Sequence, residues 1–169
     1  MVLSGELGRL TRLERFARRF PIQIDFLGRA LALTEDVAGA VWEIGLGGGR
    51  TLEYLETRTE KPITVFEIDD VVEFSPMRSG TTLVKSDLIA DLPNIVRQHR
   101  NSVAFVHVDI GTTDYVDDLG RLAALGEQLG EVLNKGGVIV SDRPVAFSGL
   151  KLIASSHQAG WPCYMWQQQ

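Results

Sequence analysis

A cluster of four glycines, GLGGG at 45–49, separates an apolar run from a helical pattern. Glycine permits a tight turn there and lets the backbone approach a ligand without a Cβ in the way. A dinucleotide-binding loop reads GxGxxG, whereas Arg50 stands where the third glycine belongs. Glu43, two residues before the turn, would repel a diphosphate. The loop therefore favours a ligand that carries an ammonium or sulfonium charge.

Acidic side chains also end the next two apolar runs. Glu67 closes the run ITVFEI, where a carboxylate can accept hydrogen bonds from both hydroxyls of a ribose. Asp87 follows the run TTLVKS and is well placed to reach an exocyclic amine such as that of adenine, with the Leu88 backbone beside it. Together these residues indicate a nucleoside without requiring a phosphate.

The elements that must position these residues alternate between short apolar runs and helical patterns. The runs are near-continuously apolar, as is typical of strands covered on both faces by helices. Strands are predicted at 40–45, 63–68, 81–86, 102–110, 137–142 and 161–166, and helices at 50–58, 88–99, 114–133 and 148–159. The predicted fold class is α/β: a three-layer, mostly parallel sheet with helices on both faces.

The amino-terminal region has a different pattern. Apolar residues at 3, 7, 10, 13, 16 and 20 have the spacing of one helical face, and Pro21 is expected to end that helix. A second helix is expected in IQIDFLGRALAL, 22–33. We therefore predict one domain over 1–169, with amino-terminal helices in 1–37, a ligand-binding core in 38–145, and a terminal helix and edge strand in 146–169.

Charge and composition limit the partners. The formal net charge of −5 disfavours nucleic acid, because such binding needs many basic contacts to phosphate. The first twenty residues nevertheless hold five arginines and two glutamates. This basic stretch could contact RNA, an acidic partner or the substrate, or could simply be a solvated helix face. The net charge of the whole chain therefore favours small molecules or proteins as partners.

The cysteine count and the hydropathy pattern suggest a location. Cys163 is the only cysteine, which excludes an internal disulfide framework and a cysteine-rich metal site. No eighteen apolar residues run together, and the amino terminus lacks the apolar core of a signal peptide. We therefore expect a cytoplasmic protein that neither spans a membrane nor is exported.

Residues 38–145 carry five motifs in an informative order: WEIGLGGG, FEID, SDL, FVHVDIGT and KGGVIVSD. Together they resemble the class I S-adenosyl-L-methionine-dependent methyltransferases, which have a Rossmann-like fold. The resemblance implies that S-adenosylmethionine is the cofactor, with the glycine loop at its methionine end, Glu67 at the ribose and Asp87 with Leu88 at the adenine. The cofactor-binding residues implied are Glu43, Gly45, Leu46, Gly47, Gly48, Gly49, Glu67, Ile68, Ser86, Asp87, Leu88 and Asp109.

The same resemblance places Asp109 between cofactor and substrate. Methyl transfer depends mainly on placing the nucleophile near the methyl group, and a general base helps when the nucleophile is a hydroxyl. Asp109 is the first catalytic candidate, although it could instead fix the loop after its strand. His107, two residues earlier on the same strand face, is the second candidate, although a histidine in an apolar strand is commonly a hydrogen-bonded core residue.

A metal site is a further implication of the resemblance. Some O-methyltransferases of this fold bind a divalent metal through acidic residues after the fourth and fifth strands. Asp109 and Asp142 are weak candidates for such a pair, which with water could hold Mg²⁺. Arg143 breaks the pattern, because those families often carry a second acid at that position.

The resulting functional hypothesis is a methyltransferase that uses S-adenosylmethionine and a small-molecule acceptor, with oxygen or nitrogen as the acceptor atom. The signature of amide methylation, Asn or Asp followed by Pro-Pro and an aromatic residue, is absent where DIGT stands, which disfavours DNA bases. Two alternatives stay open: an NAD(P)-dependent oxidoreductase, and a non-catalytic cofactor-binding partner subunit.

The carboxyl-terminal region is shorter than expected for this resemblance. Only about 27 residues follow Asp142, enough for one helix and one strand rather than the usual terminal hairpin. Trp161, Tyr164 and Trp166 would then form an exposed aromatic tail, which favours a homo-oligomer. Earlier in the chain, Asp114 and Tyr115 follow the fourth predicted strand and could line the substrate pocket, although Asp114 could instead cap the next helix.

Overall fold

The computed structural model describes residues 10–69, 77–110 and 115–169. Within these residues seven strands form one sheet in the order β3-β2-β1-β4-β5-β7-β6. Strands β1 to β5 are parallel, and β7 runs antiparallel to both of its neighbours. The strands are β1 Ala40–Ile44, β2 Ile63–Glu67, β3 Thr81–Lys85, β4 Val103–Val108, β5 Leu133–Ser141, β6 Leu150–Ser156 and β7 Cys163–Gln168.

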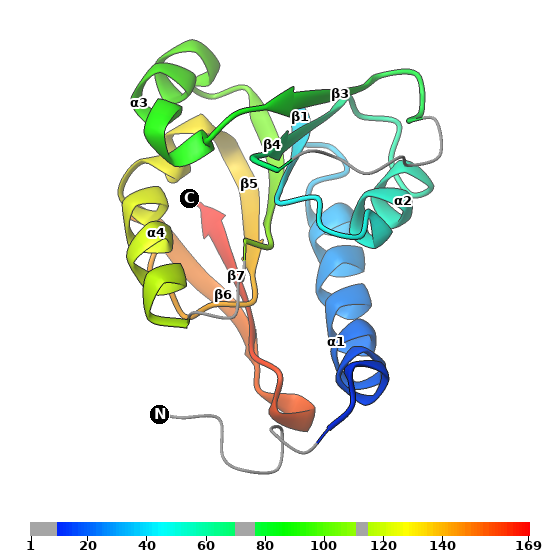
Figure 1. Ribbon diagram of the computed structural model, residues 1–169. Helices are drawn as coiled ribbons and strands as arrows, with labels where there is room; N and C mark the ends of the chain where they lie inside the picture. Colours follow the sequence, from blue (N-terminus) through cyan, green and yellow to red (C-terminus); the bar gives the residue numbers. More distant parts are fainter. Residues whose placement is uncertain (1–9, 70–76, 111–114) are drawn as a thin grey trace.

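Helices cover both faces of this sheet (Figure 1). They are α1 Arg12–Leu33, α2 Arg50–Glu56, α3 Leu88–His99 and α4 Tyr115–Gln128, with short 3₁₀ turns at η2 Leu129–Val132 and η3 Gln158–Gly160. One apolar core joins the sheet to α3 and α4, and a second joins it to α1 and α2. The three-layer, mostly parallel α/β fold predicted from the sequence is confirmed.

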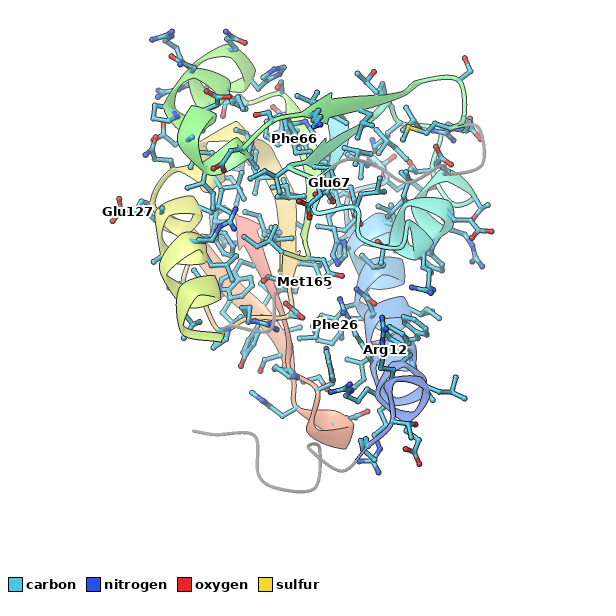
Figure 2. All side chains as sticks on the ribbon, in the orientation of Figure 1. Arg12, Phe26, Phe66, Glu67, Glu127 and Met165 are labelled. Atoms are coloured by element: carbon cyan, nitrogen blue, oxygen red, sulfur yellow. The ribbon has the colours of Figure 1, made fainter. Side chains whose placement is uncertain are left out.

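The core is made by the near-continuous apolar runs of the central strands. All six residues of β4 are buried, and so are the last four of β1. Figure 2 shows that Phe66 and Met165 point into the molecule, whereas Glu127 on α4 points away from it. Because parallel strands end at a common edge, this packing brings the residues that follow β1, β2, β3 and β4 together.

The amino-terminal prediction was wrong in one respect. Pro21 does not end a helix; it lies inside the single helix α1, whose start is capped by Thr11 and Glu14. Although proline removes one backbone hydrogen bond, the following residues form a stripe buried against the sheet, and this packing outweighs the local penalty. The stripe consists of Ile22, Gln23, Phe26, Leu27 and Ala30.

The carboxyl-terminal prediction was also wrong. Residues 148–159 do not form a helix, because 150–156 form strand β6, which pairs with β7 in an antiparallel hairpin. An extended strand spans a given length with few residues, so the residues after Asp142 are enough for two strands. Strand β7 lies between β5 and β6 rather than at an edge. Trp166 is buried and Tyr164 half-buried, so the exposed aromatic tail that favoured a homo-oligomer does not exist.

The two residues predicted to line the substrate pocket fall at a gap in the described residues. Asp114 lies outside them, and so does the side chain of Tyr115. Within the described residues, no helix is long and apolar enough to cross a membrane.

Candidate functional site

The carboxyl ends of β1 to β4 surround a cleft of about 190 Å³. Eight of the twelve residues predicted to bind the cofactor line this cleft: Gly45, Gly47, Glu67, Ile68, Ser86, Asp87, Leu88 and Asp109. The side chain of Glu43 is fully buried elsewhere, and Leu46, Gly48 and Gly49 belong to the loop without lining the cleft. The cleft is therefore built largely from residues that the sequence singled out.

Gly45 is where the glycine loop comes closest to another strand. Its φ is +88°, and a Cβ built on it would lie 2.3 Å from the backbone oxygen of Asp109, which follows β4. Its N–H donates to the carbonyl of Phe66 at the end of β2. Only glycine fits this position, because a side chain would separate the ends of β1 and β4.

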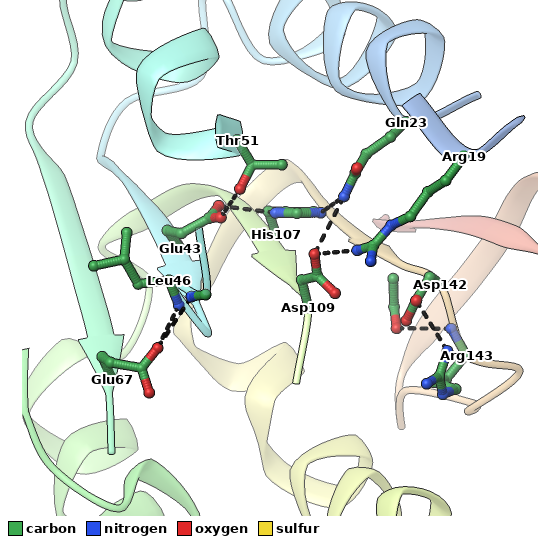
Figure 3. A network of polar contacts seen from close by, with 12 residues as sticks. Arg19, Gln23, Glu43, Leu46, Thr51, Glu67, His107, Asp109, Asp142 and Arg143 are labelled. Carbon is green, nitrogen blue, oxygen red and sulfur yellow. Dashed lines mark hydrogen bonds and ion pairs between the residues drawn. The ribbon is translucent and has the colours of Figure 1, made fainter. Parts of the chain in front are cut away.

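Glu67 ties the loop to the end of β2. One carboxylate oxygen accepts hydrogen bonds from the N–H groups of Leu46, at 2.7 Å, and Gly47, at 3.2 Å (Figure 3). The other accepts from the N–H groups of Ile68, at 2.8 Å, and Asp69, at 3.0 Å. Partial burial opposes ionisation, but these four donors outweigh it and lower the pKa of Glu67. The result is a fixed anion at the rim of the cleft.

Asp87, which also lines the cleft, has a structural role. It is the N-cap of α3, and its Oδ1 accepts from the N–H of Ile89 at 3.1 Å. Arg121 of α4, which also lines the cleft, approaches the same oxygen at 4.0 Å. The residue predicted to contact adenine is therefore also the N-cap of α3.

A buried ion pair lies behind the glycine loop. Nδ1 of His107 is 2.8 Å from Oε2 of Glu43, and both side chains are almost inaccessible to solvent. Thr51 of α2 donates to the other Glu43 oxygen. Burial disfavours the imidazolium, but the charge of Glu43 and its hydrogen bond prevail and raise the pKa of His107. Glu43 is thus paired inside the protein rather than turned toward the cleft.

Asp109 is held by two side chains of α1. Arg19 and Gln23 both donate to its Oδ2, the latter at 3.3 Å (Figure 3). The Gln23 amide nitrogen also lies 3.5 Å from Nε2 of His107. Helix α1 therefore joins the buried ion pair to the wall of the cleft.

Asp142, after β5, forms a second carboxylate–guanidinium pair with Arg143 at 2.9 Å. Burial, together with the charge of Asp109, raises the pKa of Asp142 to about 6, although the neighbouring arginines lower it. Each of the two proposed metal ligands thus has an arginine as its partner. Among the described residues, no three histidine, cysteine or acidic side chains gather in a way that could hold a metal ion.

Residues 10–167, which include every residue of the cleft, match the family described as S-adenosyl-L-methionine methyltransferase. The chain belongs to this family. This family assignment supports the methyltransferase hypothesis over the nicotinamide-dependent oxidoreductase and the non-catalytic subunit that the sequence left open. No curated protein matches the chain.

Solved structures agree with this family assignment. The S-adenosyl-L-methionine methyltransferase from Silicibacter pomeroyi is 25% identical, with a TM-score of 0.81 over 95% of this chain and 100% of that one. CalS11, a TDP-rhamnose 3′-O-methyltransferase of calicheamicin biosynthesis, is 16% identical, with a TM-score of 0.56 over 95% and 88% of the two chains. MycE of mycinamycin biosynthesis, solved with Mg and SAH, is 13% identical, with a TM-score of 0.58 over 85% and 48%. The last two show similarity of fold alone.

Four residues of the candidate site were missed by the sequence analysis. Arg19 and Gln23 reach Asp109 from a helix about ninety residues earlier, and Thr51 reaches Glu43 from α2. Arg121 enters the cleft from α4. The position of Thr51 on the first turn after the glycine loop was the one usable signal. The other three contacts depend on tertiary packing.

The close approach at Gly45 gives a stability prediction. In Gly45→Ala the new methyl group would overlap the Asp109 carbonyl, and such overpacking typically costs about 1–3 kcal/mol. Gly47→Ala is the matched control, since Gly47 also has a positive φ but nothing lies within 4 Å of a Cβ there. Urea unfolding should show that Gly45→Ala loses more stability than the control by about this amount. Equal losses would contradict the assigned close contact.

The buried ion pair gives a pH prediction. A free histidine is half-protonated at about pH 6.5. At this pH His107 should be an imidazolium in more than half of the molecules, because its pKa is raised. The stabilisation from this raised pKa is complete below about pH 6.5 and is lost as the pH rises through the folded-state pKa. In Glu43→Gln the attraction disappears while burial remains, so the pKa of His107 should fall below its ordinary value. NMR titration of the His107 imidazole measures its pKa in the wild type and in Glu43→Gln. An unchanged pKa in the variant would contradict the pairing of His107 with Glu43.

Proposed function

We propose that the cleft at the ends of β1 to β4 holds S-adenosylmethionine and that the methyl group passes to a small-molecule acceptor through oxygen or nitrogen. The observation that carries the proposal is the convergence of the glycine loop, Glu67 and Asp87 on one cleft. A fixed carboxylate at Glu67 suits the two ribose hydroxyls, and Asp87 with Leu88 suits the adenine. The glycine loop would face the methionine end. The net charge of −5 supports a small molecule over a nucleic acid.

Asp109 is the residue best placed to act between cofactor and acceptor. It lines the cleft, and Arg19 with Gln23 fixes its orientation. His107 does not line the cleft, so we assign it a positioning role that reaches Asp109 through Gln23. The rate of transfer would then depend mainly on how well the acceptor is aligned.

The residues present do not fit a catalytic Mg²⁺. The cation would have to displace Arg19 from Asp109 and Arg143 from Asp142, and it would gain only two carboxylates in their place. We therefore propose that the guanidinium groups occupy the positions that a metal would need. No catalytic step is assigned to a metal.

Calorimetric titration of Glu67→Gln tests the cofactor site. The wild type should bind S-adenosylmethionine and S-adenosylhomocysteine but not NAD. Because hydrogen bonds to a charged group contribute about 1.5–3 kcal/mol, Glu67→Gln should bind roughly 10- to 150-fold more weakly. The charge-matched control is Glu127→Gln, an exposed residue that does not line the cleft, whose affinity should be unchanged. Unaltered affinity in Glu67→Gln, or binding of NAD alone, would refute the assigned site.

A further inference from the structure

A small cavity adjoins the cofactor cleft without being part of it. It has a volume of about 10 Å³ and lies between α1, the end of β5 and the turn before β7. Arg19, Gln23, His107, Asp142 and Trp161 contribute its polar lining. Among the described residues, the two spaces have no lining residue in common. They are linked because Arg19 and Gln23, which line the cavity, bind Asp109, which lines the cleft. A cavity of this size holds one water-sized group.

Three polar atoms of the residues that line this cavity are buried and have no hydrogen-bond partner in the described structure. Two are donors, Nε of Arg19 and Nε1 of Trp161, and one is an acceptor, Oδ1 of Asp142. Asp142 is a buried residue, and about nine-tenths of its side chain is inaccessible to solvent. The Arg19 guanidinium lies 5.4 Å from the centre of the Trp161 ring, which keeps the two donors near each other. Buried polar groups are ordinarily satisfied, so three unmatched atoms at one cavity suggest a missing ligand atom.

The donor and acceptor pattern restricts what that ligand group can be. A hydroxyl accepts two hydrogen bonds and donates one, which matches two N–H donors and one carboxylate oxygen. A carboxylate or phosphate can only accept and would be repelled by Asp142, whereas an ammonium can only donate and would be repelled by Arg19. A carboxamide also donates and accepts, but through two separate atoms, whereas a hydroxyl does both through one atom.

We propose that this cavity is a subsite for one hydroxyl group of the methyl-accepting substrate, so that the acceptor is a hydroxylated small molecule. The inference rests on the proposed function, because it presumes that the acceptor approaches the cofactor beside Asp109. The hydroxyl would accept from Arg19 and Trp161 and donate to Asp142. Since Arg19 also holds Asp109, filling the subsite would fix the acceptor relative to the cleft. A lone water is the competing occupant.

The indole N–H of Trp161 provides a direct test by NMR. The protein is saturated with S-adenosylhomocysteine and titrated with phenol, with toluene as the probe of matched shape that lacks the hydroxyl. The Trp161 resonance, identified by its loss in Trp161→Phe, should shift saturably with phenol and not with toluene or benzoate. The buried Trp166 indole serves as the internal control. No shift with phenol, or an equal shift with toluene or benzoate, would overturn the proposal and leave a water site.

A variant separates this test from the proposed function and from misfolding. In Trp161→Phe the ring remains and one donor is lost, so phenol should bind about 2- to 12-fold more weakly, as followed at the Arg19 Nε–H resonance. Its affinity for S-adenosylhomocysteine should be unchanged, which confirms folding. An unchanged phenol affinity would contradict the role of Trp161. Failure of the wild type to bind S-adenosylhomocysteine would instead contradict the proposed function.

Discussion

The backbone contact between Gly45 and Asp109 is the constraint on which the rest of the site depends. At this point the ends of β1 and β4 approach so closely that no Cβ can stand between them. The amide of Asp109 donates to Ile44 and that of Gly45 donates to Phe66, so three neighbouring strands end in register. The glycine loop can then turn over the sheet edge with its N–H groups facing Glu67. The cleft is the space that this arrangement leaves open.

Charge compensation behind the cleft is the second determinant. Glu43 comes just before the loop and is fully buried, which would be costly without the partner His107 and the hydroxyl of Thr51. On the other side, Arg19 and Gln23 of α1 neutralise and orient Asp109. Helix α1 therefore does more than cover one face of the sheet. It also supplies the polar groups that stand between the cleft and the cavity beside it.

Much of the cleft at the ends of β1 to β4 could be predicted from the sequence, because the relevant signals are local. Glycines after an apolar run indicate a tight turn, and the acids Glu67 and Asp87 each come at the end of a predicted strand. Parallel strands bring such positions to one edge without any knowledge of packing. The same reasoning could not foresee that Glu43 turns inward, because its partner His107 lies 64 residues away on a neighbouring strand.

The two wrong predictions of secondary structure, at Pro21 and at 150–156, have a similar physical origin. From its neighbours in sequence alone, Pro21 is expected to end a helix. Burial of residues such as Phe26 and Leu27 against the sheet nevertheless keeps α1 continuous. The segment 150–156 has an apolar pattern that suits a helix as well as a strand, and pairing with β7 decides the outcome. Arg19 and Trp161 come from opposite ends of the chain, so their meeting at one cavity could not be predicted.

The most direct test of the central claim is the change in backbone amide chemical shifts when S-adenosylhomocysteine is added. Glu67 accepts from the amides of Leu46, Gly47, Ile68 and Asp69, and ribose hydroxyls would compete for the same carboxylate. These four amides should therefore show the largest changes, with small changes in β6 and β7. Largest changes in the β6–β7 hairpin, or no changes at all, would contradict the placement of the cofactor in this cleft.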